Sequence, residues 1–313
     1  MAESSDNLKD VYREFATIDE YFYVTDEGQF RVDTAHKSIN DYCNSWWDQG
    51  KDNCHNHLEM TNCSVIYLLK NFKKYGLEYD KFAEYVILWL SYKLNRNPQH
   101  KFDKLNDFYT KYIETNTHYN NIINDDGNMT YKDIIDKKKE LMDMNINEIS
   151  KFNGLFSILF YLYYLFNVER LNCETNLKLA NNFADIFKER NNDSNNIKGS
   201  LYNQILSTLS DDYNILINKY GNKCTNFKSL TELNPQKIPV GNSVQPTVLS
   251  PEGTPSSSSI LNTVIPVLST FSVISLFLGV AYKYSLFGID KLFQRQYIRN
   301  KLKKITKKME LNI

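Results

Sequence analysis

The segment FAEYVILWLSYKLN, residues 82–95, carries the helical pattern on which the predicted fold depends. Its apolar residues recur at helical spacing and share one face: Ala83, Val86, Ile87, Leu90 and Leu94. The residue before a proline is pushed out of the helical region, so Asn97 and Pro98 end the pattern. The segment therefore predicts an amphipathic helix.

Comparable patterns fill residues 6–231, separated by short connections rich in Asn, Asp and Gly. We expect further helices at Leu8–Tyr23, Ser64–Tyr75, Phe102–Tyr119, Tyr131–Met142, Cys173–Arg190 and Leu201–Tyr220. Strand signals are scarce. The sequence therefore predicts an all-α fold, with a helical domain at residues 1–231.

The stretch FNGLFSILFYLYYLFNV, residues 152–168, is the most apolar part of this domain. Its unbroken apolar run, Leu155–Phe166, has about 12 residues, whereas a membrane span needs about 20. We therefore expect a central helix that is buried on most sides.

A second uncharged stretch follows a change in composition. Residues 234–259 contain five prolines, two glycines and a serine run with no periodic apolar face, so residues 232–259 are expected to form a flexible stalk. Residues 260–282 then carry no charge over 23 positions, which is long enough to cross a bilayer as one helix. The predicted transmembrane helix includes Ile260, Pro266, Phe271, Leu276 and Tyr282.

The predicted tail, residues 283–313, holds nine Lys and Arg against two acidic residues. By the positive-inside rule this tail is cytosolic and the N-terminal domain is extracytoplasmic in a single-pass membrane protein. The N-terminal MAESSDNLKD has no apolar core, so we expect no cleaved secretory signal. Insertion after synthesis would reverse the orientation, and this alternative stays open.

The tail also has helical periodicity, with a basic face at Lys291, Arg295, Arg299, Lys303 and Lys307. A basic amphipathic helix beside a span is expected to lie on anionic lipid. A solvated, frayed tail is the equal alternative. The domain itself has no basic stripe with interleaved aromatic residues, so we expect no nucleic-acid partner.

Five cysteines are candidates for disulfides: Cys43, Cys54, Cys63, Cys173 and Cys224. This odd set is compatible with two disulfides and one free thiol in an oxidising compartment, and the sequence leaves the pairing open. The segment 42–63 holds three of them with His55 and His57, but no Cys-x-x-Cys pair. Its irregular spacing favours a disulfide-stapled loop over a zinc site.

Motifs for catalysis and cofactor binding are missing from the chain. The segment around Asp126 and Gly127 has Ile122 where a calcium-binding loop needs a carboxylate, so we expect a turn there, with Thr130 capping the next helix. The sequence therefore predicts no enzyme, no cofactor and no metal. Three Asn-x-Ser/Thr triplets, at Asn62, Asn128 and Asn192, fit an exported domain.

Several segments together resemble one known family. They are ATIDEYF at 16–22, EYVILWLSYKLN at 84–95, LSTLSDDYN at 206–214, NKCTNFKSLTEL at 222–233, and SSSSILNTVIPVLS with FLGVAYKYSLFGIDK before the basic end. In this order they resemble the Plasmodium interspersed repeat (PIR) proteins, in particular the rodent-malaria CIR, YIR and BIR members.

The resemblance implies a variant antigen that the parasite exports to its host red cell, with a helical, cysteine-containing ectodomain and one transmembrane helix. It also implies roles in immune evasion and host-cell adhesion, with a host receptor or antibody as partner and no catalysis. The chain departs from the family where Val11 and Tyr12 replace an expected cysteine, so one cysteine is expected to lack its partner. The alternative is a membrane-anchored structural adaptor whose tail binds anionic lipid or the host cytoskeleton.

Overall fold

The computed structural model describes residues 5–25, 28–32, 54, 56–97, 102–123, 128–166, 173–224 and 226–236. The chain divides into two compact units, Met1–Val240 and Gly241–Ile313. All described residues belong to the first unit, which we call the body. The predicted span at 260–282 and the predicted tail at 283–313 lie outside the described residues.

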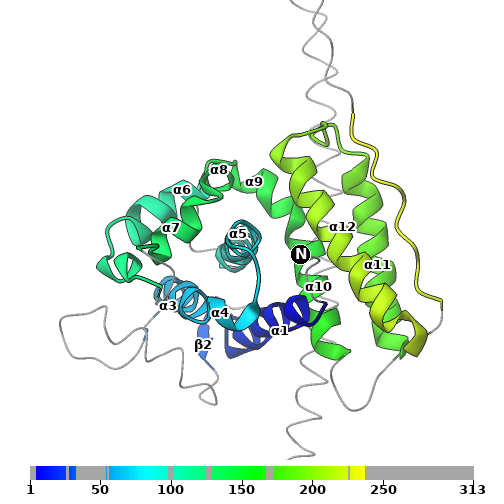
Figure 1. Cartoon of the computed structure of the whole chain (residues 1–313), viewed down its shortest axis with the longest axis horizontal. Coiled ribbons are helices and arrows are strands. Elements are labelled where there is room, and N and C mark those ends of the chain that lie inside the picture. Colours follow the sequence, from blue (N-terminus) through cyan, green and yellow to red (C-terminus); the bar gives the residue numbers. More distant parts are fainter. Residues whose placement is uncertain are drawn as a thin grey trace, which may run out of the picture. The chain divides into compact units, whose positions relative to one another are not determined.

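Helix α5 (Tyr79–Asn95) lies in the middle of the body, where Figure 1 shows it end-on with other helices around it. It packs against α3 (His57–Lys70), α7 (Tyr131–Asp136) and α10 (Asn153–Leu165). The helix ends before Pro98, as the sequence predicted. The sequence predicted that only one face of this helix is apolar and buried. Instead, every residue from Phe82 to Leu94 is buried, Glu84 and Lys93 included.

Helix α10 is the second buried helix and confirms the central helix predicted at 152–168. Eleven of its 13 residues are buried. Three helices pack on it in addition to α5: α1 (Ser5–Tyr21), α11 (Cys173–Asn191) and α12 (Leu201–Tyr220). A bilayer span would expose this apolar surface to lipid, whereas here other helices cover it.

Shorter elements complete the body. They are α4 (Phe72–Tyr75), α6 (Leu105–Phe108), η1 (Tyr109–Ile113), η2 (Thr117–Asn120), α8 (Lys139–Met142), α9 (Ile146–Ile149), η3 (Ser150–Phe152) and η4 (Gly221–Lys223). The single helix predicted at Phe102–Tyr119 is therefore wrong, because the Asn116 side chain accepts a hydrogen bond from the His118 N–H and starts a new turn. The helix predicted at Tyr131–Met142 divides into α7 and α8.

Two helix starts follow local capping chemistry. The Thr130 hydroxyl accepts from the Asp133 N–H at 3.1 Å while the Asp133 carboxylate accepts from the Thr130 N–H at 2.8 Å, which confirms the predicted cap. The Asn56 side chain likewise caps α3 by accepting from the Glu59 N–H at 3.0 Å. Helix α3 consequently begins at His57, inside the segment predicted as a stapled loop.

A two-stranded antiparallel sheet follows α1 and was not predicted. Strand β1 (Phe22–Val24) pairs with β2 (Phe30–Val32), and Phe22 faces Val32 in the register. The Phe22 ring is buried and lies edge-on to Trp89 of α5, with ring centroids 6.4 Å apart. Three residues per strand give too short an alternation for a strand signal.

A buried ion pair joins α1 to α5. The Lys93 ammonium lies 2.7 Å from the Asp19 carboxylate, and the Tyr92 and Tyr161 hydroxyls donate to the same carboxylate at 3.0 and 2.7 Å. Burial alone would raise the pKa of Asp19, but the charges of Lys93 and Arg96 and these hydrogen bonds bring the pKa below its ordinary value. Asp19 is therefore held as a carboxylate inside the body.

Replacing Lys93 tests this arrangement. The substitution Lys93→Met leaves the buried Asp19 carboxylate without its cation and is expected to lower the free energy of unfolding by about 3 to 5 kcal/mol. Urea denaturation followed by circular dichroism measures the change. As a matched control, Lys178→Met removes the exposed pair with Glu174 and should leave the free energy of unfolding nearly unchanged. Equal effects of the two substitutions would contradict the assignment.

Candidate functional site

The body contains a second buried carboxylate, which ties four helices together. Asp212 of α12 is fully buried and accepts from the Tyr12 hydroxyl of α1 at 2.7 Å and from the Tyr85 hydroxyl of α5. The Lys81 ammonium of α5 lies 3.2 Å from it, and the Tyr163 hydroxyl of α10 donates to its backbone carbonyl at 2.9 Å. Burial raises the pKa of Asp212, and the Lys81 charge opposes that shift. With no surface exposure, this group stabilises the fold and offers no carboxylate to a substrate.

Glu84 of α5 is a buried carboxyl near the same place. Burial, assisted by the Asp212 charge, raises the pKa of Glu84 to about 7, while a hydrogen bond with Thr208 and the charges of Lys138 and Lys81 oppose the rise. Within the described residues its Oε1 atom has no hydrogen-bond partner. Near neutral pH the body therefore contains a carboxyl that is costly to ionise.

The raised pKa makes the stability of the body depend on pH. The native state holds the Glu84 proton more tightly than the unfolded chain, so Glu84 favours folding at low pH and this advantage is lost as the pH rises towards 7. The substitution Glu84→Gln keeps the shape without the charge. We expect the variant to gain about 3 kcal/mol over the wild type between pH 4 and pH 8.

Urea denaturation of both proteins across this pH range measures the difference. Glu140→Gln, at an exposed position of α8, is the matched control and should follow the wild-type curve. Parallel curves for wild type and Glu84→Gln would show that Glu84 does not titrate between pH 4 and 8.

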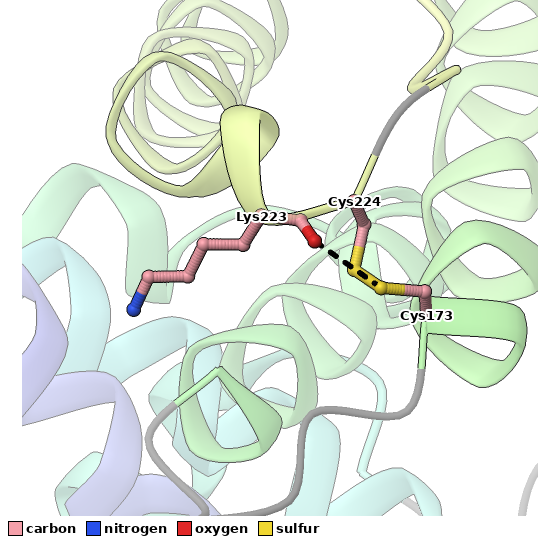
Figure 2. The surroundings of a disulfide bond; sticks show 3 residues. All are labelled: Cys173, Lys223 and Cys224. Atoms are coloured by element: carbon pink, nitrogen blue, oxygen red, sulfur yellow. Dashed lines mark hydrogen bonds between the residues drawn. A yellow bond between two sulfur atoms is a disulfide. The ribbon is translucent and has the colours of Figure 1, made fainter.

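One disulfide joins the two ends of the α11–α12 pair. Cys173 begins α11 and Cys224 follows η4, as Figure 2 shows, and their Cα atoms lie 5.4 Å apart. The Lys223 carbonyl oxygen lies 3.4 Å from the Cys173 sulfur. The bond spans 51 positions, and closing a loop of this length stabilises a fold by about 4 kcal/mol in the chain-entropy model. The predicted disulfide-containing domain is confirmed by this pair.

Residues 226–236 after this disulfide form an extended segment, which we call the strap. It runs along α11 and α12 towards the turn between them (Figure 1). Near its start, the Lys228 ammonium pairs with Asp185 of α11 at 2.7 Å, and the Tyr213 hydroxyl of α12 donates to the Lys228 carbonyl at 2.9 Å. The start of the strap is thus bonded to both helices.

The far end of the strap is bonded to the turn between α11 and α12. The buried Asn191 side chain donates to the Glu232 carbonyl at 2.8 Å and accepts from the Asn234 N–H at 3.0 Å. Backbone bonds join Gln236 to Asn196 at 2.7 Å and to Lys198 at 3.1 Å. The body therefore extends past residue 231, the predicted end of the helical domain, into the predicted stalk.

The structure brings together two of the three cysteines in segment 42–63. Cys54 precedes α3 and Cys63 lies inside it; both are buried, and their sulfur atoms lie 2.8 Å apart. No cysteine of the described part of the chain is free. Cys43 lies outside the described residues, so the expected unpaired cysteine stays a prediction.

The alternative zinc site is only partly covered by the structure. His57 is buried, with its ring edge-on to Phe22 at 5.4 Å, while His55 lies outside the described residues. Within the described ranges no three His, Cys, Asp or Glu side chains lie together as metal ligands would. His57 of α3 thus packs against an aromatic ring.

The three predicted glycosylation triplets differ in accessibility. Asn62 is fully buried in α3, where its side chain accepts from the Tyr119 hydroxyl. Asn128 and Asn192 are exposed. An enzyme that attaches a glycan to the folded body could reach Asn128 and Asn192 but not Asn62.

The surface of the described residues has little exposed apolar area. Tyr23 and Ile122 are the large apolar side chains exposed there. A shallow hollow at Asn128, Met129, Asp133, Asp136 and Lys137 is lined by two carboxylates that are already bonded, Asp133 to Thr130 and Asp136 to Lys132 and Tyr109. The described body therefore presents a mainly polar surface.

The membrane-related predictions concern other residues. In the part of the chain that the structure describes, no helix is both long enough and apolar enough to cross a bilayer. The span residues from Ile260 to Tyr282 and the basic tail face from Lys291 to Lys307 are not among the described residues, so both stay predictions.

Comparisons with known proteins identify the family. A model of the Plasmodium variant antigen protein Cir/Yir/Bir matches residues 12–283. A solved structure, described as that of a Plasmodium PIR protein ectodomain, is 32% identical to this chain; the match covers 75% of this chain and 100% of that one, with a TM-score of 0.56. No curated protein matches the chain in sequence.

The helical, disulfide-bonded body is thus similar in fold to the solved PIR protein ectodomain. The chain belongs to the Plasmodium variant antigen family Cir/Yir/Bir, which confirms the resemblance in its sequence. This family is one of antigens and not a known enzyme family.

Proposed function

We propose that this protein is a single-pass variant surface antigen that the parasite exports to the infected red cell. In this proposal the body is extracytoplasmic, residues 260–282 cross the bilayer and residues 283–313 are cytosolic. Its activity is display and binding, without catalysis, cofactor, metal or nucleic acid. The observation that carries the proposal is the family match to residue 283, which includes the body, the stalk and the predicted span.

Charge and cysteine chemistry support the orientation. Nine Lys and Arg follow the uncharged stretch, and the positive-inside rule keeps such a tail on the cytosolic side. The Cys173–Cys224 disulfide is of the kind that persists in oxidising compartments. Both features favour an exposed body and a cytosolic tail.

Immune evasion by antigenic variation is the biological role that we propose, with antibody as one partner and a host-cell receptor as another. The turn at 190–200 suits such contacts because Asn192, Ser194 and Lys198 are exposed. The buried Asn191 and Asn196 in the same turn hold the strap and stabilise the fold. Variation is therefore expected at the exposed positions and not at the buried ones. We propose that the loops at 97–102 and 124–130 vary as well, and the structure describes only part of each.

Protease protection tests the topology. Intact infected red cells are treated with protease and probed with antibodies against the body and against residues 283–313, with a host cytosolic protein as the integrity control. Loss of the body signal with retention of the tail signal is expected. Protection of both ends would place the protein on an internal membrane, and loss of the tail alone would indicate the reverse orientation.

A second candidate function is that of a structural adaptor. It is favoured by the basic tail face, which suits anionic lipid or an acidic cytoskeletal partner. In that case the body acts mainly as a spacer. Protection of both ends in the same experiment would favour this function over display.

A further inference from the structure

We propose that the Cys173–Cys224 disulfide and the strap form a mechanical stop. Tension applied from the C-terminal side first pulls the strap off the body, and the disulfide then passes the tension to α10 while α11 and α12 stay folded. This inference rests on the proposed function, because a membrane anchor after the strap is the source of the tension.

A covalent path lets force bypass α11 and α12. Cys173 and Cys224 are joined directly, so a force entering at Cys224 crosses to Cys173 without stretching the residues between them. The bond spans 51 positions, which correspond to about 170 to 180 Å of extended chain. Force cannot extend this part of the chain while the disulfide is intact.

The strap is held to the body by weak contacts. Within the described residues they are single hydrogen bonds, one exposed ion pair and the ring contact of Phe227 with Phe166, and the last of them is at Gln236. Contacts of this kind are individually weak. Tension on Gln236 therefore breaks them in order back towards Lys228, and release stops at Cys224. The 12 residues after Cys224 correspond to about 40 Å of extended chain.

Aromatic packing joins α10, α12 and the strap near the disulfide. Phe166, which follows α10, stacks on Tyr220 of α12 with ring centroids 5.1 Å apart, and Phe227 of the strap lies 5.8 Å from Phe166. From Cys173 the chain leads back to α10, the helix that α1, α5, α11 and α12 cover. The force thus arrives at a helix of which 11 of the 13 residues are buried.

Single-molecule force spectroscopy on the purified full-length protein tests the stop. Handles at the two chain ends apply the force, and residues 237–313 contribute equally to every protein compared. For the oxidised wild type, we expect a first event from the body that releases about 40 Å of chain, followed by further unfolding only at higher force.

The double variant Cys173→Ser/Cys224→Ser removes the stop, so its first release should run on into α12 and be more than twice as long. If this variant fails to fold, wild type reduced after folding serves the same purpose. Tyr213→Phe, which removes a strap contact, should lower the force of the first event without changing its length. Tyr109→Phe, which removes a hydrogen bond to Asp136 of α7 and touches no residue of the strap, is the matched control.

Two outcomes would overturn the inference: a first event in the oxidised protein that already includes α12, or an unchanged first event after loss of the disulfide. Either result is independent of topology, because the measurement uses no membrane. If force spectroscopy shows the stop but protease protection shows the reverse orientation, only the proposed function is contradicted.

Discussion

The buried carboxylate of Asp212 is the constraint on which the helical body depends. A charge in a low-dielectric interior is costly unless hydrogen bonds and a counter-charge surround it, and here Tyr12, Tyr85 and Lys81 supply them. These partners come from α1 and α5, so α12 can be placed correctly only when both helices are in position. Asp19 and Lys93 impose a similar requirement between α1 and α5. Residues up to 200 positions apart therefore have to meet in one arrangement.

Most helices could be predicted from the sequence, because periodicity and capping are local signals. Helix α12 spans the predicted Leu201–Tyr220, and the cap at Thr130 formed as expected. The broken segment after Phe102 could not be predicted in the same way, since a side-chain bond at Asn116 competes with helix continuation over a few residues. The burial of every residue of α5 from Phe82 to Leu94 was also missed. Lys93 resembles an exposed residue until its partner Asp19, 74 positions away, is known.

The candidate site was predicted less well than the fold. Five cysteines allow many pairings, and only the folded chain brings Cys173 next to Cys224. The strap was assigned in part to the stalk because its proline, polar residues and lack of periodicity resemble a linker. Its contacts are to backbone groups and to Asn191, which leave no repeating pattern in the sequence. The polar surface and the buried ionic core together allow exposed residues to change while the fold is kept.

The bonds of the strap also matter for anyone who isolates the body as a soluble fragment. A boundary drawn where the helical pattern ends, near residue 231, would remove Asn234 and Gln236. The Asn191 side chain would then lose both the Glu232 carbonyl and the Asn234 N–H, and the turn at Asn196 and Lys198 would lose its backbone pairing. An immunogen cut there would present a loosened turn to the immune system and raise antibodies against a shape that the intact antigen does not display. The useful boundary lies beyond Gln236.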